Sequence, residues 1–252
     1  MQSEGRGTAI ITGGSRGIGA ACARLAAQAG WNVCVNYTSN VDAANAVVAE
    51  VEAAGAQGLA VKADVADEAQ VTTMFAVAAK ALGPVTALVN NAGILENQMP
   101  LAEMSAARFA RVFSVNITGA LLCAREAVRV MATSRGGPGG VIVNMSSAAA
   151  RLGSPNEYVD YAASKGAIDT LTIGLSKEVG GDGIRVNAVR PGLILTDIHA
   201  SGGDPDRATR LGSGVPMGRP GTAEEVAETV LWLMSDKSSY VNGALIDVTG
   251  GR

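Results

Sequence analysis

The chain has 252 residues, of which 48% are hydrophobic, 4% are aromatic and 32 are glycine, and its formal net charge is −3. This length suits one full-sized α/β core, and no Pro/Ser-rich linker or charged block divides it, so we expect a single domain over residues 1–252. A slightly acidic chain lacks the basic footprint of a nucleic-acid-binding protein. No apolar run is long enough to span a membrane, and residues 1–6 contain no apolar signal segment. We therefore expect a cytoplasmic protein without nucleic-acid or membrane partners.

The cysteine and histidine content argues against a metal site. Cys22, Cys34 and Cys123 show no CxxC spacing and lie within apolar or helical patterns. This favours reduced thiols that pack in the interior of a protein from a reducing compartment. His199, the single histidine, lacks neighbouring ligands, and we interpret it as solvated.

The chain opens with a strand–helix–strand pattern. The β-branched residues 8–12 predict a buried strand, residues 20–29 predict a helix that ends near Gly30, and residues 31–37 predict a second strand. Between the first strand and the helix lies Gly13-Gly-Ser-Arg-Gly-Ile-Gly19. Such a turn lets the backbone approach a pyrophosphate, which the amide groups and dipole of the helix stabilise. We expect a dinucleotide to contact Gly13, Ser15, Arg16, Gly17, Ile18 and Gly19.

The end of the second strand indicates which dinucleotide binds. An acid there normally holds the ribose 2′-OH of NAD, whereas basic residues accommodate the 2′-phosphate of NADP. Here Tyr37 and Thr38 end the strand, and the first acid is Asp42. Arg16, in the glycine loop, can reach a 2′-phosphate. We expect NADP(H), with NAD(H) and a merely solvated Arg16 as the alternative.

The rest of the chain continues the alternation of strands and helices. Strands are predicted at 58–65, 86–90, 141–145, 184–189 and 242–248, and helices at 41–54, 67–82, 105–135 and 158–179. With short connections this predicts an α/β fold, a Rossmann-type doubly wound, seven-stranded parallel sheet with helices on both faces. Residues 196–220 are rich in Gly, Pro, Asp and Arg and predict a mobile lid. Thr222-Ala-Glu-Glu predicts an N-capped final helix.

Three segments would meet at the carboxyl ends of the parallel strands, where ligands of such folds bind. They are the glycine loop, Asp64 with Val65, and Asn90-Asn-Ala-Gly93. Asn116 lies among Val, Phe and Ile, so it is either locally bonded or part of a polar network of the site.

Tyr161 and Lys165 stand at i and i+4 of a predicted helix and share one face. At about 4 Å and an effective dielectric near 20, a lysine ammonium favours the phenolate by about 4 kcal/mol, roughly three pKa units. That would bring the tyrosine pKa from about 10 towards neutrality, where it can exchange a proton. The alternative is an exposed lysine beside a half-buried aromatic. Tyr158 has Ala162 at i+4 and is not expected to act as the acid.

Two further expectations concern residues outside this pair. Glu157 and Asp160 flank the tyrosine and are expected to face solvent or the lid. Trp232 and Met234, in the final helix, are expected to make core or subunit contacts.

In their order and spacing, the motifs resemble those of the short-chain dehydrogenase/reductase family over essentially the whole chain. The matching elements are Thr12-Gly-Gly-Ser-Arg-Gly-Ile-Gly19, Asp64-Val65, Asn90-Asn-Ala-Gly93, Asn116, Ser146-Ser147, Tyr161-Ala-Ala-Ser-Lys165 and Pro191-Gly192. Each element alone is ambiguous, but their ordered co-occurrence is specific. Within the family, the chain looks closest to the glucose 1-dehydrogenase-like and 3-oxoacyl reductase branches.

The resemblance implies roles at the matching positions. Tyr161 would be the general acid/base, Lys165 would lower the tyrosine pKa and bond the nicotinamide ribose, and Asn116 would position a water in a proton relay. A serine would bond the substrate oxygen; strand alternation favours Ser147 over Ser146. Cofactor contacts are implied for Asp64 and Val65 (adenine), Asn90, Ala92 and Gly93 (ribose region), and Pro191, Gly192, Ile194 and Thr196 (nicotinamide amide), besides Tyr161 and Lys165.

The resulting hypothesis is an NADP(H)-dependent oxidoreductase acting on a small-molecule carbonyl or secondary alcohol. One alternative is an NAD-preferring sugar dehydrogenase, and another is an NADP(H)-binding regulatory or structural protein without turnover. The resemblance also implies a homo-oligomer, tetramer or dimer, with residues 105–135 and 161–179 forming a four-helix interface.

Overall fold

The computed structural model describes residues 6–252, apart from the side chain of His199, and in this range seven parallel strands form one sheet. Their order is β3-β2-β1-β4-β5-β6-β7, as predicted for a doubly wound sheet. The strands are β1 (Thr8–Ile11), β2 (Asn32–Tyr37), β3 (Gly58–Lys62), β4 (Val85–Asn90), β5 (Gly140–Met145), β6 (Ile184–Pro191) and β7 (Leu245–Val248). The predicted strand count is confirmed, although β3 stops three residues earlier than expected.

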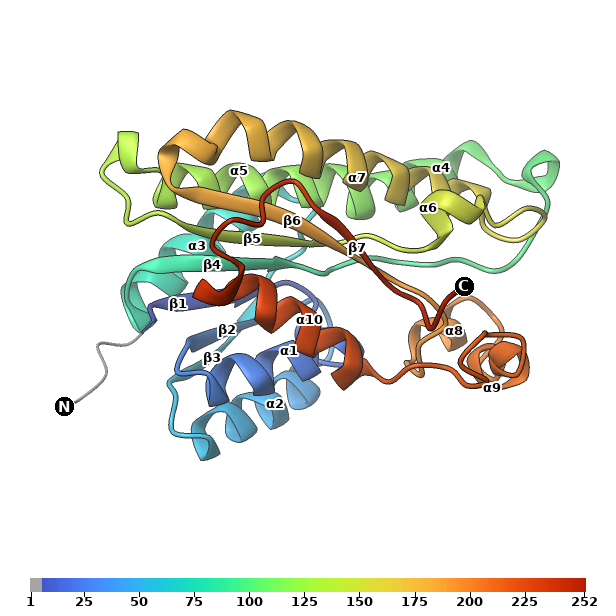
Figure 1. Ribbon diagram of the computed structural model, residues 1–252, viewed down its shortest axis with the longest axis horizontal. Helices are drawn as coiled ribbons and strands as arrows, with labels where there is room; N and C mark the ends of the chain where they lie inside the picture. The colour runs from blue at the N-terminus through green and yellow to red at the C-terminus, as the bar shows by residue number, and fades with distance from the viewer. Residues whose placement is uncertain (1–5) are drawn as a thin grey trace.

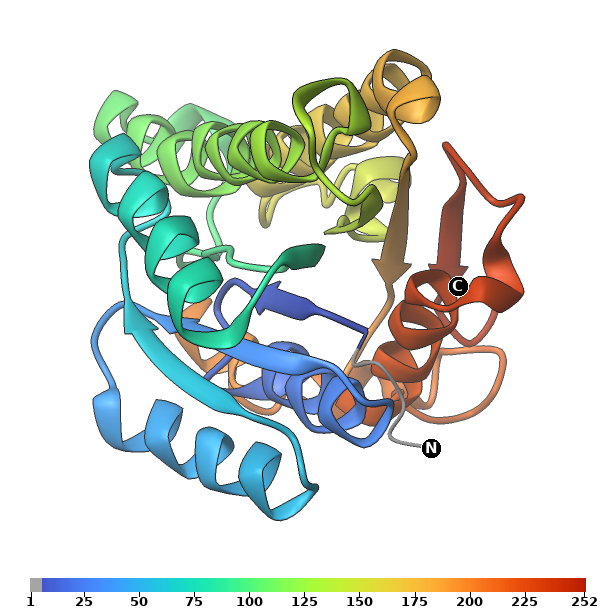
Figure 2. The ribbon, with the colours of Figure 1, turned by 90° about the vertical axis from the view of Figure 1, so that its left-hand side faces the viewer.

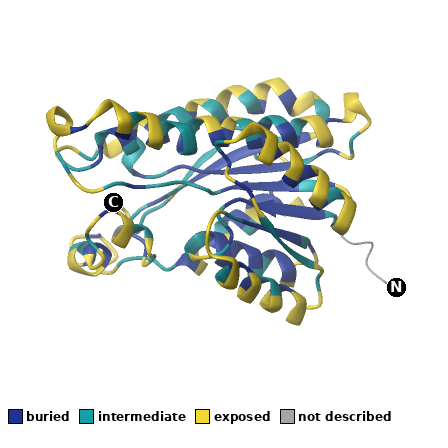
Figure 3. Ribbon diagram, turned by 180° about the vertical axis from the view of Figure 1, so that it is seen from behind, coloured by how far each residue is buried: buried dark blue, intermediate teal, exposed yellow. Residues whose placement is uncertain are grey.

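Helices cover both faces of the sheet (Figures 1 and 2). One face carries α1 (Gly17–Gln28), α2 (Val41–Ala53) and α10 (Ala223–Met234), and the other carries α3 (Glu68–Leu82), α5 (Ala120–Met131) and α7 (Val159–Val179). The central strands β1, β4, β5 and β6 and most of β2 are buried between them, whereas the edge strands β3 and β7 are partly exposed (Figure 3). Both cores consist mainly of alanine, valine, isoleucine and leucine, so the helices can lie close to the strands.

The shorter elements lie mostly at the two ends of the sheet. They are α4 (Ala106–Phe113), α6 (Ala149–Leu152), α8 (Ile198–Ser201), α9 (Arg207–Gly212) and single 3-10 turns at Leu101–Glu103, Thr133–Arg135, Gly180–Asp182 and Asp236–Ser238. No helix within residues 6–252 combines the length and apolar composition that crossing a bilayer would require.

The strand order reverses beside β1, which pairs with β2 on one side and β4 on the other. At such a switch point the loops leaving neighbouring strands turn to opposite faces, which opens a crevice at their carboxyl ends. Thr12 bridges this point, because its Oγ1 accepts hydrogen bonds from the backbone N–H groups of Asn91 and Ala92, each at 2.9 Å. The switch point therefore places the glycine loop beside the loop that follows β4.

The single helix predicted over 105–135 is interrupted. A π-helical segment, Ser114–Gly119, separates α4 from α5 and contains Asn116. Such wide turns displace a side chain from the regular helical spacing and often mark functional sites. The apolar periodicity of this stretch does not reveal the interruption.

The predicted lid, residues 196–220, carries α8 and α9 beyond the carboxyl ends of the strands (Figure 1). The helix after it begins as predicted: Thr222 accepts a hydrogen bond from the backbone of Glu225, whose carboxylate accepts one from the backbone of Thr222. This reciprocal cap marks the return of the chain from the lid to the sheet.

Candidate active site

A cavity of about 520 Å³ opens at the carboxyl ends of the strands, lined by the loops that follow β1 to β6. Nineteen of the residues predicted for the site line it: Gly13, Ser15, Arg16, Gly17, Ile18, Gly19, Tyr37, Thr38, Asp64, Val65, Ala92, Gly93, Ser147, Tyr161, Lys165, Pro191, Gly192, Ile194 and Thr196. Asn90 and Asn116 do not line it. The topology thus collects residues from six separate loops in one cavity.

The glycine loop forms a cradle that larger residues would fill. Gly13 and Gly17 have φ of +61° and +52°, a region that side-chain-bearing residues rarely adopt. A Cβ at Gly19 would lie only 2.3 Å from the carbonyl oxygen of Gly13. Glycine at these positions therefore allows α1 to start tightly against the end of β1, with its amide groups at the cavity.

The N-terminus of α1 is open toward the cavity. Arg16 at the start of α1 makes no side-chain cap. Among the described helices α5, α6, α7 and α9 also lack one, whereas α2, α3, α4 and α10 have it. Uncapped N–H groups together with the helix dipole favour an anion at this position. The cradle and the open helix end fit the pyrophosphate of a dinucleotide.

Two asparagines that the sequence analysis did not select hold the loop in place. Asn36 accepts a hydrogen bond from the N–H of Gly13 at 3.1 Å and donates to the carbonyl oxygen of Ala63. Asn91 donates to the carbonyl oxygens of Thr12 and Gly13. Both also line the cavity. An asparagine at the end of an otherwise apolar strand, as in Val33-Cys-Val-Asn36, is the signal that could have identified such a brace.

Tyr161 lies in the first turn of α7, hydrogen-bonded with Ser147 at the end of β5. Lys165 is one turn further along; its Nζ lies 5.5 Å from the centre of the tyrosine ring and donates to the carbonyl oxygen of Met145 at 2.8 Å. The i, i+4 spacing thus brings tyrosine and lysine to one face of the helix, as predicted, and β5 adds the serine.

The predicted lowering of the tyrosine pKa is wrong for this structure. Burial raises the pKa of Tyr161 to about 12, and the hydrogen bond with Ser147 only partly opposes this. Burial also lowers the pKa of Lys165 to about 8, against the attraction of Asp169. The ammonium bonds a carbonyl oxygen instead of the phenol, so the desolvation of each group outweighs their mutual attraction.

Ser146 also lines the cavity, but its hydroxyl is bonded to buried groups. Its hydroxyl donates to Asp169 at 2.7 Å, and this carboxylate also pairs with Arg190 of β6 at 2.8 Å. Asp169 follows Lys165 by one helical turn. The buried cluster ties β5, β6 and α7 together beneath the cavity, which gives Ser146 a bracing position and leaves Ser147 beside the phenol.

Asn116 braces the cavity wall from behind. In the π-helical segment its Oδ1 accepts from the N–H of Ile94 at 2.8 Å, and its Nδ2 donates to the carbonyl oxygen of Ile94 and to Ser164 Oγ. Ser164 Oγ in turn donates to the carbonyl oxygen of Tyr161 at 2.7 Å. Asn116 is thus buried in the polar network expected for it, and its role in a water relay stays a prediction.

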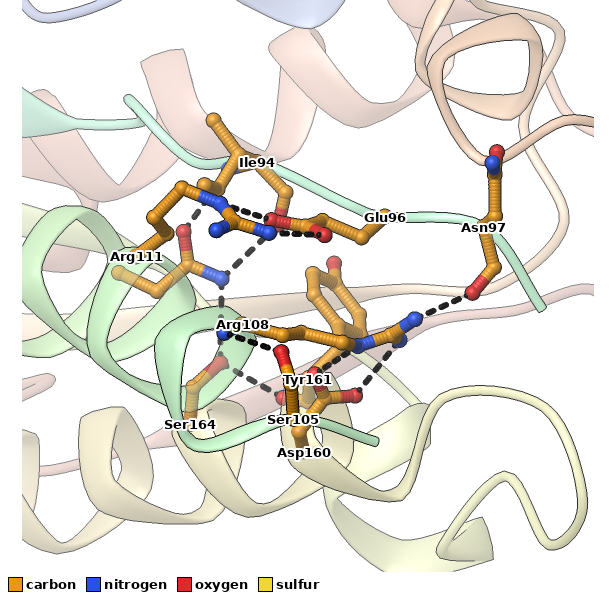
Figure 4. A network of polar contacts seen from close by, with 10 residues as sticks. Ile94, Glu96, Asn97, Ser105, Arg108, Arg111, Asp160, Tyr161 and Ser164 are labelled. Atoms are coloured by element: carbon orange, nitrogen blue, oxygen red, sulfur yellow. Dashed lines mark hydrogen bonds and ion pairs between the residues drawn. The ribbon is translucent and has the colours of Figure 1, made fainter. Parts of the chain in front are cut away.

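Asp160 does not face solvent or the lid, contrary to expectation. Its side chain is 1% exposed and pairs with Arg108 of α4 at 2.6 and 3.1 Å (Figure 4). Burial alone would raise the pKa of this carboxyl, but hydrogen bonds from Arg108 and the backbone of Tyr161 hold it below its usual value. Arg108 also donates to the carbonyl oxygen of Asn97, so it links the loop after β4 to the first turn of α7.

The side chain of Asn90 does not line the cavity, and its contact with the cofactor stays a prediction. Its side chain is buried and donates to the carbonyl oxygen of Ala120 and to Asn144 Oδ1 on the neighbouring strand. The amide therefore joins β4 to α5 and β5, while Asn91, Ala92 and Gly93 line the cavity instead.

The remaining expectations have mixed outcomes. Cys22, Cys34 and Cys123 are free and buried, and burial raises the pKa of each thiol to about 12, as expected for packing residues.

Met234 is in the core, whereas Trp232 is 40% exposed. Glu157 faces the lid, as expected, and pairs with Arg207 of α9. The side chain of His199 lies outside the described residues.

The chain has clear relatives among known proteins. Residues 13–252 match the model of a family described as enoyl-(acyl carrier protein) reductase. The uncharacterized oxidoreductase YgfF of Escherichia coli K12 is 57% identical over 97% of this chain and 99% of its own length. The chloroplastic NADPH-dependent aldehyde reductase-like protein of Arabidopsis thaliana is 38% identical over 96% and 93%. Levodione reductase has a superposable crystal structure, with a TM-score of 0.89, 33% identity and coverage of 97% of this chain and 96% of that one.

Proposed function

This chain belongs to the short-chain dehydrogenase/reductase family of oxidoreductases, and on that premise we propose that it transfers hydride between NADP(H) and a carbonyl compound or secondary alcohol, with Tyr161 as general acid/base. The observation that carries the proposal is the position of Tyr161 in the cavity, hydrogen-bonded with Ser147 and one helical turn from Lys165. The nicotinamide, when bound, supplies or accepts the hydride.

Tyr161 has the protonation state that carbonyl reduction needs. Because burial raises its pKa to about 12, the phenol carries its proton at neutral pH and can donate it. Reduction adds two electrons and one hydrogen to the carbonyl carbon as hydride, and the proton of Tyr161 passes to the carbonyl oxygen. Ser147 holds that oxygen through a hydrogen bond, which orients it toward the phenol.

Lys165 stabilises the tyrosine oxygen after the phenol has donated its proton. Its pKa of about 8 leaves the ammonium mostly charged at pH 7. A buried ammonium 5.5 Å from the ring centre stabilises the negative charge that the tyrosine oxygen gains on donation. Its Nζ lies 3.6 Å from the point where a Cβ on Gly93 would be, and both residues line the cavity, which supports the proposed bond of Lys165 to the nicotinamide ribose.

The preference for NADP(H) is supported by the charged side chains that line the cavity. Arg16 is exposed and lines the cavity together with Tyr37 and Thr38. Among the described residues, the carboxylates that line the cavity are Asp64 and Asp197, which follow β3 and β6. The residues at the end of β2 that line the cavity thus include no acid, and the glycine loop adds a guanidinium to the same cavity, which supports binding of a 2′-phosphate.

The proposal is tested by replacing Tyr161 with phenylalanine. We expect Tyr161→Phe to lower kcat for carbonyl reduction at least about a hundredfold, because it removes the general acid. NADPH binding, measured by fluorescence, should stay within about twofold, since the ring is retained. Tyr240→Phe is the matched control, because Tyr240 is fully exposed.

Two results would contradict the proposal. Turnover near wild type in Tyr161→Phe would show that the tyrosine is not the general acid. Clearly tighter binding of NADH than of NADPH by the wild-type protein would show that Arg16 does not select the 2′-phosphate.

A further inference from the structure

One end of the cavity, here called the lid end, lies between residues 94–98, residues 149–158 and the segment 198–212. A Cβ on Gly202 of the lid would lie 2.9 Å from Leu95 Cδ2 and 3.0 Å from Tyr158 Oη, so these surfaces are in direct contact. Much of the lining of the lid end is hydrocarbon, contributed by Ile94, Leu95, Ala149, Leu152 and Ile198, and Leu193 after β6 adds to the cavity wall. Leu95 and Leu193 are only 8% and 7% exposed, so the wall is fixed by packing.

The strongest polar groups of the lid end are already partnered within the chain. Arg207 is 8% exposed, and its two terminal nitrogens bond the two carboxylate oxygens of Glu157 at 2.8 and 2.6 Å. Its guanidinium also lies over the ring of Tyr158, 5.4 Å from the centre. The phenol of Tyr158 donates to the carbonyl oxygen of Gly202 at 3.3 Å. The buried positive charge is therefore neutralised, and the phenol proton is engaged.

The other described cations that line the cavity do not change this balance. Arg16 starts α1, Lys165 bonds the carbonyl oxygen of Met145, and Arg252 is exposed to solvent. Ser154 adds one hydroxyl to the lining. Asp197, next to Ile198, adds a carboxylate to the lining, which would repel an anionic substrate. The lid end thus offers few unpartnered hydrogen-bonding groups for the part of a substrate that extends away from Ser147 and Tyr161.

Resting on the proposed function, we infer that the substrate is an uncharged carbonyl compound whose group beyond the carbonyl is apolar, such as a medium-chain or cyclic aldehyde or ketone. A sugar would bury several hydroxyls without partners, which is costly. A carboxylate would meet an arginine already paired with Glu157, and would lie beside that second negative charge. An alkyl group instead gains from leaving water for the leucine and isoleucine wall.

The test measures NADPH oxidation by the wild-type protein with aldehydes of increasing length, propanal to heptanal, and with D-glucose and pyruvate. We expect kcat/KM to rise about fourfold for each added methylene until the lid end is full, the increment for burying one such group. Glucose and pyruvate should stay below about one hundredth of the best aldehyde.

A pair of leucine variants locates the effect. Leu152 lines the cavity and is 45% exposed, whereas Leu101 is 55% exposed and does not line it. Leu152→Ser should flatten the dependence on chain length, and Leu101→Ser should leave it unchanged. Thermal unfolding of both variants checks that the fold is retained.

The outcomes separate this inference from the proposed function. Comparable turnover of glucose or pyruvate, or a kcat/KM that does not change with chain length, would overturn the apolar substrate class and leave the oxidoreductase assignment in place. NADPH binding without oxidation in the presence of any compound would overturn the proposed function, and the inference with it.

Discussion

Ser146 and Ser147 are neighbours in the chain, yet they have different surroundings. One hydroxyl is buried against Asp169, and the other lies in the cavity with Tyr161. Consecutive side chains at the end of a strand point in opposite directions, so the two hydroxyls reach different groups. The two serines therefore allow a direct comparison of a bracing and a substrate-facing hydroxyl.

We expect Ser147→Ala and Ser146→Ala to have opposite effects. Ser147→Ala should lower kcat about tenfold or more and change stability little, because it removes a group that holds the substrate oxygen. Ser146→Ala should lower the free energy of unfolding by about 1–3 kcal/mol, because it leaves the buried Asp169 with one hydrogen bond fewer. Steady-state kinetics and urea unfolding of both variants check this. A larger loss of kcat in Ser146→Ala than in Ser147→Ala would show that Ser146, and not Ser147, holds the substrate oxygen.

At the level of elements, α4 and the π-helical segment hold two parts of the site in register. Asn116 bonds Ile94, Arg111 bonds Glu96, and Arg108 bonds both Asn97 and Asp160 (Figure 4). The loop after β4 forms one wall of the cavity, and Asp160 precedes Tyr161 on α7. Arg108 therefore connects the substrate wall to the helix turn that carries the phenol.

The Arg108–Asp160 pair should matter for stability mainly because it is buried. We expect Arg108→Met to lower the free energy of unfolding by about 3–5 kcal/mol, since it leaves the Asp160 carboxylate buried without its cation. Replacing both residues, as Arg108→Met with Asp160→Leu, should recover most of the loss.

The control for this experiment is the ion pair between Arg111, on the same helix as Arg108, and Glu96. The side chain of Arg111 is 57% exposed. Arg111→Met should cost at most about 1 kcal/mol. Equal losses from Arg108→Met and Arg111→Met in urea unfolding would show that burial does not govern these pairs.

At the scale of the whole molecule, α5 and α7 lie beside one another on the outside of the sheet (Figures 1 and 2). They share a surface groove whose aliphatic lining, Leu121, Val128, Leu171 and Leu175, is bordered by charged residues, Arg125, Arg129, Arg135 and Glu178. Ile173 of α7 is 40% exposed. Exposed apolar surface on two adjacent helices is typical of a subunit contact. This agrees with the four-helix interface expected from the family resemblance.

We expect the protein to be a dimer or tetramer whose assembly depends on this face. Leu121→Glu combined with Ile173→Glu should lower the molar mass measured by light scattering to that of a smaller assembly or a monomer, because a charge is costly to bury in an apolar contact. Val77→Glu is the control, since Val77 on α3 is equally exposed at 40%. A wild-type protein that is monomeric at micromolar concentration would contradict the prediction.

The sequence alone determined the features that depend on local patterns. The alternation of strands and helices, the glycines at 13, 17 and 19 and the spacing of Tyr161 and Lys165 predict the sheet, the cofactor loop and the shared helix face. Each follows from interactions within a few residues, or from rules of connection that hold for any parallel sheet.

The tertiary structure alone decided where buried polar groups find their partners. Asp160 pairs with an arginine 52 residues away, although it was expected to face solvent or the lid, and the side chain of Asn90 bonds a carbonyl 30 residues away. The pKa of Tyr161 depends in the same way on the complete burial environment, which outweighs the lysine four residues along the helix. Desolvation and long-range hydrogen bonds are properties of the packed chain, so no periodicity or local spacing in the sequence reports them.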